Sequence, residues 1–162
     1  MKTTLRILAL TLAALTLVLC FAACGNKGSA SNLDFKSGDV TVTVGADSAP
    51  VIEKLGSWVS MNSSDSCGGF QGKDYIYTYH GFRVSTTPAE GGQIICKVEL
   101  TDDSVKTPEG LYIGMSRTAA EVVMKGYNAV SMGGNLSYTT ETVTLNVTFR
   151  DDCVSGIVYV AK

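Results

Sequence analysis

The sequence predicts an α+β fold of two tandem units, each a helix followed by a three-stranded antiparallel meander, packed together as one domain. Two stretches lead to this prediction: residues 111–126, and a weaker copy of them at 42–56. Each runs from a short strand through a glycine and a residue that can cap a helix, and a second glycine ends the helix. Alternating apolar residues follow each copy, which is the period of half-buried strands.

In the first unit, valine alternates with threonine over residues 40–44, which predicts a strand. Asp47 is placed to cap a helix that ends at Leu55. A hairpin over residues 75–86 and a strand over 94–100 complete the expected meander.

In the second unit, Ser116 is the expected helix cap, and Thr118 is the alternative start. Three strands are expected after the helix, over residues 136–138, 143–149 and 154–160. The middle one has the clearest apolar alternation in the chain. Because units this small bury little surface alone, we expect the two to share one interior.

The N-terminus has the pattern of a secretory signal. Lys2 and Arg6 precede an apolar run over residues 7–23. The run ends in Phe-Ala-Ala-Cys, and small residues just before Cys24 resemble a bacterial lipobox. The resemblance implies cleavage and a diacylglyceryl group on the Cys24 thiol. An uncleaved membrane anchor is the alternative, which is disfavoured because it needs no cysteine there.

These features predict four segments: a lipoprotein signal peptide at 1–23, a lipidated flexible tether at 24–38, a first unit at 39–105 and a second at 106–162. Acyl chains contribute about 0.8 kcal/mol per buried methylene, so a doubly acylated protein stays on the membrane. The expected location is therefore the extracytoplasmic face of the cell membrane, with the lipid on Cys24 as the membrane partner.

The charge of the chain is mildly acidic. Of its 13 basic and 15 acidic residues, two basic ones lie in the signal, which leaves a net charge near −4 for the mature chain. Nucleic acid and an anionic lipid surface both favour basic patches. We therefore expect neither as a partner.

The segment 57–73 is polar, rich in glycine and without apolar period, so it is predicted to be a long loop, and such loops are either functional or plain flexible connections. The strand after it is expected to place three tyrosines on one face. They form part of the core if a helix covers that face, and a binding platform if it is open. The candidate binding surface combines both segments: Trp58, Cys67, Phe70, Tyr75, Tyr77 and Tyr79.

The residues that could take part in a reaction or bind a metal are scattered along the sequence. In the mature chain, Cys67, Cys96 and Cys153 remain besides Cys24, with no Cys-x-x-Cys pair, and their pairing is open. A structural or incidental role is the favoured interpretation for all three, with Cys67 the best reactive candidate. His80 is the only histidine and is expected in a hairpin turn. No metal or cofactor is therefore predicted.

Two aspartate pairs, 102–103 and 151–152, could serve acid–base chemistry or bind Ca²⁺. Both stand where a strand ends and the chain must turn, and turns favour aspartate for local hydrogen bonding. We expect turn roles for both pairs.

The glycine, capped helix and meander resemble β-lactamase-inhibitor-like proteins and SmpA/OmlA assembly lipoproteins. Residues 66–72, 77–82 and 102–110 resemble a family of uncharacterised small lipoproteins of Gram-positive bacteria, and that likeness covers most of residues 40–162. The resemblance implies a lipid-anchored protein with tandem units. It implies no activity, because fold does not fix function.

The sequence thus predicts a non-enzymatic, lipid-anchored envelope protein that binds another protein or a wall component. The expected contacts lie on a concave sheet and the segment 57–73. One alternative is an inhibitor of an extracellular enzyme, by analogy with the two-unit β-lactamase inhibitory protein. Another is a small hydrolase or thiol enzyme that uses Cys67.

Overall fold

The computed structural model describes residues 33–162. The predicted signal peptide and Cys24 lie outside the described residues. Along residues 33–162, neither helix has the length and apolar character needed to cross a membrane. The elements follow one another as β1 Phe35–Ser37, β2 Val40–Val42, α2 Ser48–Leu55, β3 Ser60–Asp65, β4 Lys73–Thr78, β5 Phe82–Ala89, β6 Gly92–Leu100, α3 Arg117–Val123, β7 Ala129–Met132, β8 Asn135–Thr139, β9 Val143–Arg150 and β10 Cys153–Ala161.

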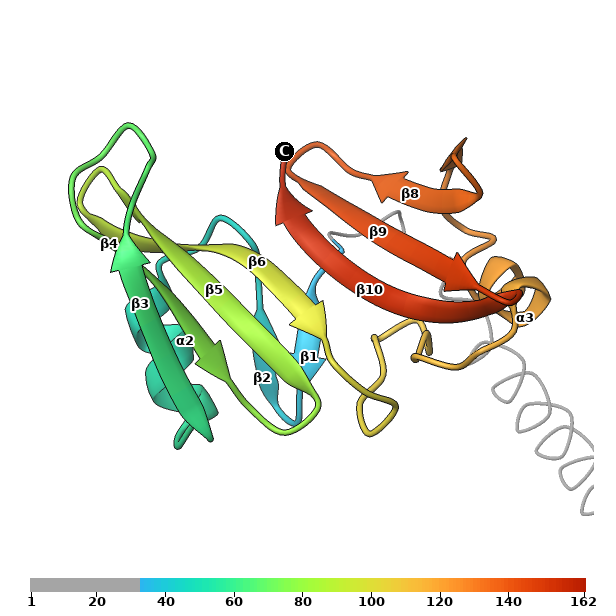
Figure 1. Ribbon diagram of the computed structural model, residues 1–162, viewed down its shortest axis with the longest axis horizontal. Helices are drawn as coiled ribbons and strands as arrows, with labels where there is room; N and C mark the ends of the chain where they lie inside the picture. The colour runs from blue at the N-terminus through green and yellow to red at the C-terminus, as the bar shows by residue number, and fades with distance from the viewer. Residues whose placement is uncertain (1–32) are drawn as a thin grey trace, which may run out of the picture. The chain divides into compact units, whose positions relative to one another are not determined.

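Eight strands form one antiparallel sheet in the order β3-β4-β5-β6-β10-β9-β8-β7 (Figure 1). β1 and β2 pair separately as a two-stranded sheet. The large sheet becomes continuous where β6 pairs with β10, with Leu100 opposite Ile157 and Val98 opposite Tyr159. Each end of the large sheet is therefore an edge strand, β3 at one end and β7 at the other.

The predicted fold class is wrong. The structure is mostly β, with 48% strand against 12% helix, and its strands form one large and one small sheet in place of two helix-plus-meander units. Four strands follow each helix, where three were predicted. The missed strands are β3 and β7, and every side chain of both is exposed. An exposed strand carries no apolar alternation, which is the signal that the prediction used.

The two predicted helix starts are confirmed. The Asp47 side chain accepts a hydrogen bond from the Ala49 N–H, and the Ser116 side chain accepts one from the Ala119 N–H. The segment before α2 is bonded to β6 through Gly45 N–H to Ile95 C=O, at 2.7 Å. The segment before α3 is bonded to β10 in the same way. The start of each helix is thus held against β6 or β10, the two strands whose pairing makes the large sheet continuous.

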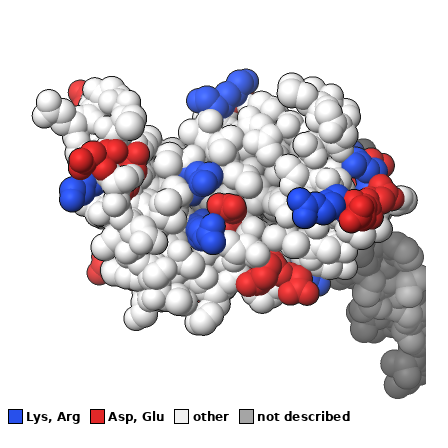
Figure 2. Space-filling model, viewed as in Figure 1, with Lys and Arg blue, Asp and Glu red and all other residues white. Residues whose placement is uncertain are grey.

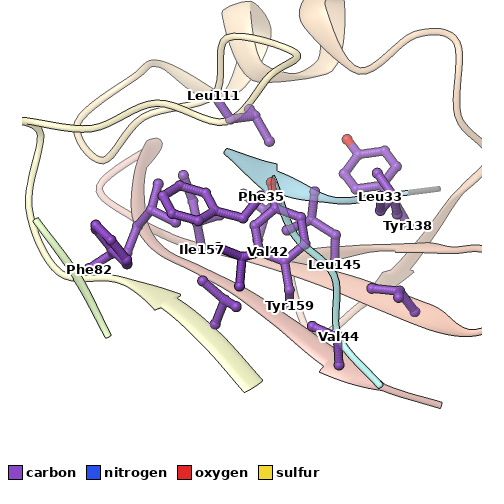
Figure 3. Close-up of a cluster of buried hydrophobic side chains, with 14 of the residues drawn as sticks. Leu33, Phe35, Val42, Val44, Phe82, Leu111, Tyr138, Leu145, Ile157 and Tyr159 are labelled. Atoms are coloured by element: carbon purple, nitrogen blue, oxygen red, sulfur yellow. The ribbon is translucent and has the colours of Figure 1, made fainter. Parts of the chain in front are cut away.

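One face of the large sheet carries the hydrophobic core (Figure 3). The helix α2 packs against β2 and β6, and α3 packs against β10. Phe35 of β1 lies over this face, with its ring centroid 4.9 Å from that of Phe82 and 6.2 Å from that of Tyr159. Each such fully buried side chain contributes about 1.5–3 kcal/mol. The opposite face of the sheet holds none of these elements (Figure 1).

The predicted tether is too long. Leu33 and Phe35 are fully buried, and the strand β1 pairs with β2. A three-residue strand set among glycine, serine and asparagine gives no period by which it could be recognised. Of the predicted segment 24–38, the part from residue 33 onward therefore belongs to the fold.

Candidate functional site

Three of the predicted surface residues lie together beside β3. The ring of Trp58 meets the ring of Tyr77 edge-on at a centroid distance of 5.2 Å, and Tyr75 stacks on Tyr77 at 6.1 Å. Met61 is the register partner of Tyr77 on β3. We call Trp58, Met61, Tyr75 and Tyr77 the aromatic cluster. It lies on the α2 side of the sheet, since neighbouring strands share faces in register.

The chain positions Trp58 through the end of α2. Gly56 adopts a φ of 73°, which turns the chain out of the helix and which an L side chain rarely adopts. Three residues later, the Val59 N–H donates to the Thr78 C=O at 2.8 Å and starts β3 along β4. Trp58 therefore stands between the helix end and the sheet, where it lines an open hollow of about 510 Å³ with Ile52 and Glu53.

The cluster remains accessible. Trp58 is 45% exposed and Met61 is 43% exposed, while the adjacent Val59 is 61% exposed. Tyr77 is half-buried, and burial is the main cause that raises its pKa, with the neighbouring Tyr75 adding to the shift. Tyr77 is consequently neutral at physiological pH, and the cluster presents an apolar surface with hydroxyl groups.

Tyr79 does not belong to this surface. Its side chain is 7% exposed and stacks on Phe82, with ring centroids 4.9 Å apart. The residue comes after β4 ends, in the hairpin turn, where its N–H donates to the Phe82 C=O. Phe82 itself contacts Phe35, so Tyr79 packs beneath the small sheet. Tyr79 is therefore part of the core, whereas Tyr75 and Tyr77 belong to an open surface.

Cys67 and Phe70 are exposed but lie away from Trp58. They stand in the turn that joins β3 to β4, which is closed by a hydrogen bond from the Ser66 N–H to the Gly72 C=O. Trp58 lies at the other end of β3, and a six-residue strand spans roughly 20 Å. The predicted loop over residues 57–73 is thus an edge strand with a short turn. The predicted surface is therefore divided, with Trp58 at one end of β3 and Cys67 and Phe70 at the other.

The cysteines do not form a reactive centre. Cys67, Cys96 and Cys153 are all free thiols. Burial raises the pKa of the Cys96 thiol, which donates a hydrogen bond to the Ser85 C=O. Cys67 and His80 lie at opposite ends of β4, again roughly 20 Å apart, so they cannot form a thiol–imidazole pair.

The two aspartate pairs, 102–103 and 151–152, lie in turns. Asp151 and Asp152 have φ values of 51° and 58° and make the two-residue turn between β9 and β10. Asp102 accepts hydrogen bonds from the Ser104 side chain and backbone, which lower the pKa of its carboxyl group. Across residues 33–162, no three His, Cys, Asp or Glu side chains are grouped as a metal would require.

Charged side chains cover only a small part of the uncovered face of the sheet (Figure 2). Side chains on it pair across strands, such as the Ser137 hydroxyl with the Asn146 carbonyl oxygen at 2.7 Å. Near its middle, Glu99 lies 3.9 Å from Arg83 and 3.6 Å from Lys97, in a small group with one more basic than acidic side chain. Such exposed pairs contribute little to stability.

A hollow of about 520 Å³ lies on this face over β3, β4, β5 and β6. Its lining includes Asn62, Ser64, Asp74, Ile76, Ser85 and Cys96. The register shifts between Ser85 and Thr86, which is a β-bulge, and bulges re-aim side chains. No local pattern in the sequence predicts this hollow, because a bulge depends on how two strands pair.

Comparison of the chain with protein-family models, with curated proteins and with solved structures finds no match. The resemblance to small Gram-positive lipoproteins therefore stays a prediction.

Proposed function

We propose that this chain is a lipid-anchored protein of the bacterial cell envelope that binds another protein through the aromatic cluster and β3. The observation that carries the proposal is a tryptophan that is fixed yet exposed. Trp58 is held by Tyr77, and Val59 and Met61 extend the apolar surface around it. Tryptophan, tyrosine and methionine are enriched in interfaces and are depleted elsewhere on surfaces.

The membrane anchor rests on the lipobox that ends at Cys24. Because Leu33 is already buried in the fold, only residues 25–32 remain as a spacer. Eight residues can span at most about 30 Å, whatever their conformation. The folded part is therefore expected to stay near the outer surface of the membrane, and its partner to be located there as well.

Localisation is tested separately from binding. Membrane fractionation and mass spectrometry of the protein from its host should find a lipid-modified Cys24, and a Cys24→Ala variant should leave the membrane fraction. A bare cysteine at residue 24 in membrane-bound protein would contradict the anchor and leave the binding proposal to its own test.

Binding is tested by cross-linking in host cells with the wild type, Trp58→Ala and Tyr77→Ala. We expect both substitutions to reduce the main cross-linked species about thirtyfold, because a hot-spot residue contributes about 2 kcal/mol and each 1.4 kcal/mol is tenfold. Met132→Ala is the matched control, because Met132 is 74% exposed and lies on β7 at the other edge of the sheet. An unchanged cross-linking pattern in all variants would remove the aromatic cluster as the binding surface.

The identity of the cross-linked species also addresses the alternatives. An extracellular enzyme whose activity falls when it is bound would point to an inhibitor. A glycan-bearing wall fragment in place of a protein would contradict the choice of a protein partner.

A further inference from the structure

Among residues 33–162, no strand pairs with the outer side of the edge strand β3. It pairs with β4 from Ser60–Thr78 to Asp65–Lys73, and it is the terminal strand of the sheet. All six of its residues are exposed. In an edge strand, alternate residues direct their N–H and C=O groups away from the sheet, where another extended backbone can pair with them.

β3 lacks the features that prevent a further strand from pairing with an edge strand. Natural edge strands carry lysine, proline, bulges or inward-pointing charges that prevent a further strand from adding. β3 reads Ser-Met-Asn-Ser-Ser-Asp, with neither lysine nor proline. Its one charge, Asp65, is the last residue and stands opposite Lys73. Nothing along residues 60–64 opposes the addition of a strand.

The other edge is the weaker candidate. β7 has four residues, Ala129–Met132, and ends at a turn made by Gly133 and Gly134. Four residues offer about two outward pairs of backbone groups, whereas six offer about three. The four residues of β7 read Ala-Val-Ser-Met and include no aromatic side chain.

On both faces of the sheet beside β3, there is a place where the side chains of an added strand could bind. Toward α2, the aromatic cluster borders the strand through Met61 and Trp58. On the uncovered face, the 520 Å³ hollow is lined by Asn62 and Ser64 of β3 and by Ile76 of β4. An added strand would direct alternate side chains to these two places, since successive residues of a strand point to opposite faces.

We propose that β3 accepts an extended segment of a partner protein as an additional strand of the sheet. The segment has large apolar residues at the alternate positions that face the aromatic cluster, and small polar residues at the positions between them. Glu53 lines the hollow beside Trp58, so a basic residue is favoured at that end of the segment. This inference rests on the proposed function and specifies how the partner is held.

The series of outward backbone groups determines the class of partner. Each outward N–H and C=O of β3 needs a partner spaced as in a strand, which an extended polypeptide supplies and a glycan does not. Main-chain bonds then give the affinity, and the alternate side chains give the specificity.

The test uses the full chain in detergent and a phage-displayed library of random linear 12-residue peptides as the probe. Selected peptides are synthesised and then N-methylated at one residue at a time. Methylation at every second residue should weaken binding about tenfold, because two hydrogen bonds are lost or blocked, and methylation at the intervening residues should have little effect. The bound peptide should also slow amide hydrogen exchange at Ser60–Asp65.

Protein variants complete the test. Met61→Ala should weaken the selected peptides about tenfold, as loss of a contacting anchor does. Thr144→Ala is the control, since Thr144 lies on β9 and the uncovered face, away from β3. It should leave the affinity within about twofold, within the usual effect of a surface change away from contacts.

Three results would overturn the inference. Affinity that is insensitive to the position of N-methylation would show side-chain docking without strand addition. Failure to select any peptide that protects β3 would exclude it as a strand acceptor. A dimer that forms through β3, detected by sedimentation and by exchange protection without peptide, would assign the edge to a second copy of this chain. In each case the cross-linking experiment with Trp58→Ala decides the proposed function by itself.

Discussion

The rings of Trp58 and Tyr77 meet at an interplanar angle of 67°, with Tyr77 stacked in turn on Tyr75. This contact fixes an indole that is still 45% exposed. A side chain that is already ordered loses less conformational entropy when a partner binds. The contact between the two rings therefore links the packing of β3 to the proposed binding surface.

The first prediction separates binding from folding at this contact. Trp58→Ala should lower the free energy of unfolding by only about 1 kcal/mol, the value of one aromatic pair at a half-exposed position. Tyr159→Ala should lower it by about 3–5 kcal/mol, because Tyr159 is fully buried in the core. Urea unfolding followed by circular dichroism measures both. A loss with Trp58→Ala as large as that with Tyr159→Ala would mean that the indole is part of the core.

The second prediction concerns alkaline pH. Burial raises the pKa of Tyr159 above the ordinary value of 10.0, with the negative charge of Glu109 adding to the shift. The folded state then keeps its proton while the unfolded state loses it. The stabilisation is complete below pH 10 and falls as the pH rises above 10, by about 1.4 kcal/mol per pH unit for one tyrosine.

Tyr159→Phe removes this titrating group. The free energy of unfolding of the variant should therefore decline more slowly between pH 10 and pH 12 than that of the wild type, as measured by urea unfolding at each pH. Tyr77, Tyr79 and Tyr138 also have raised pKa values and should keep part of the decline in both proteins. Equal slopes for variant and wild type would contradict the burial of the Tyr159 hydroxyl.

The third prediction concerns the turn between β4 and β5. Gly81 has a φ of 83°, and a Cβ there would contact the Ser104 hydroxyl oxygen and lie 2.8 Å from Val105 Cγ1. Gly81→Ala should destabilise the fold by more than about 2 kcal/mol, since backbone strain and a clash act together.

Gly91→Ala is the control for strain alone. Its φ is 86°, and a Cβ there meets no atom within 4 Å. It should cost about 1–2 kcal/mol. Thermal or urea unfolding of the pair measures the difference. Equal losses would show that the connection at Ser104 and Val105 does not pack against this turn.

The fourth prediction ranks the thiols. Cys67 and Cys153 are exposed, whereas Cys96 is half-buried and its pKa is raised by burial. Brief treatment with iodoacetamide near pH 8, mapped by mass spectrometry, should modify Cys67 and Cys153 well before Cys96, because the thiolate is the reactive form. Rapid modification of Cys96 would indicate that the bulge between β5 and β6 opens in solution.

The sequence predicted the elements that have one buried face. β9 was recognised because Val143, Leu145 and Val147 are buried while Thr144 and Asn146 between them are less so. The helix caps were recognised because Asp47 and Ser116 act through local hydrogen bonds. These features depend on residues close together in the chain, so pattern and propensity are enough.

Features that depend on distant pairing were not predicted. The join between β6 and β10 brings Leu100 beside Ile157, and no local pattern specifies that register. It converts two expected meanders into one sheet. The edge strands have no buried face to reveal them, and Tyr79 could not be told apart from Tyr75 by spacing, because its burial depends on Phe82 and β1.

The central claim is that a protein partner covers β3 at the cell envelope. Amide hydrogen exchange of residues 57–72, compared between the protein in host membrane vesicles and the purified protein in detergent, tests it most directly. We predict slower exchange in the vesicles at Ser60–Asp65, with β9 unchanged between the two states. Equal exchange at β3 in both would contradict the claim.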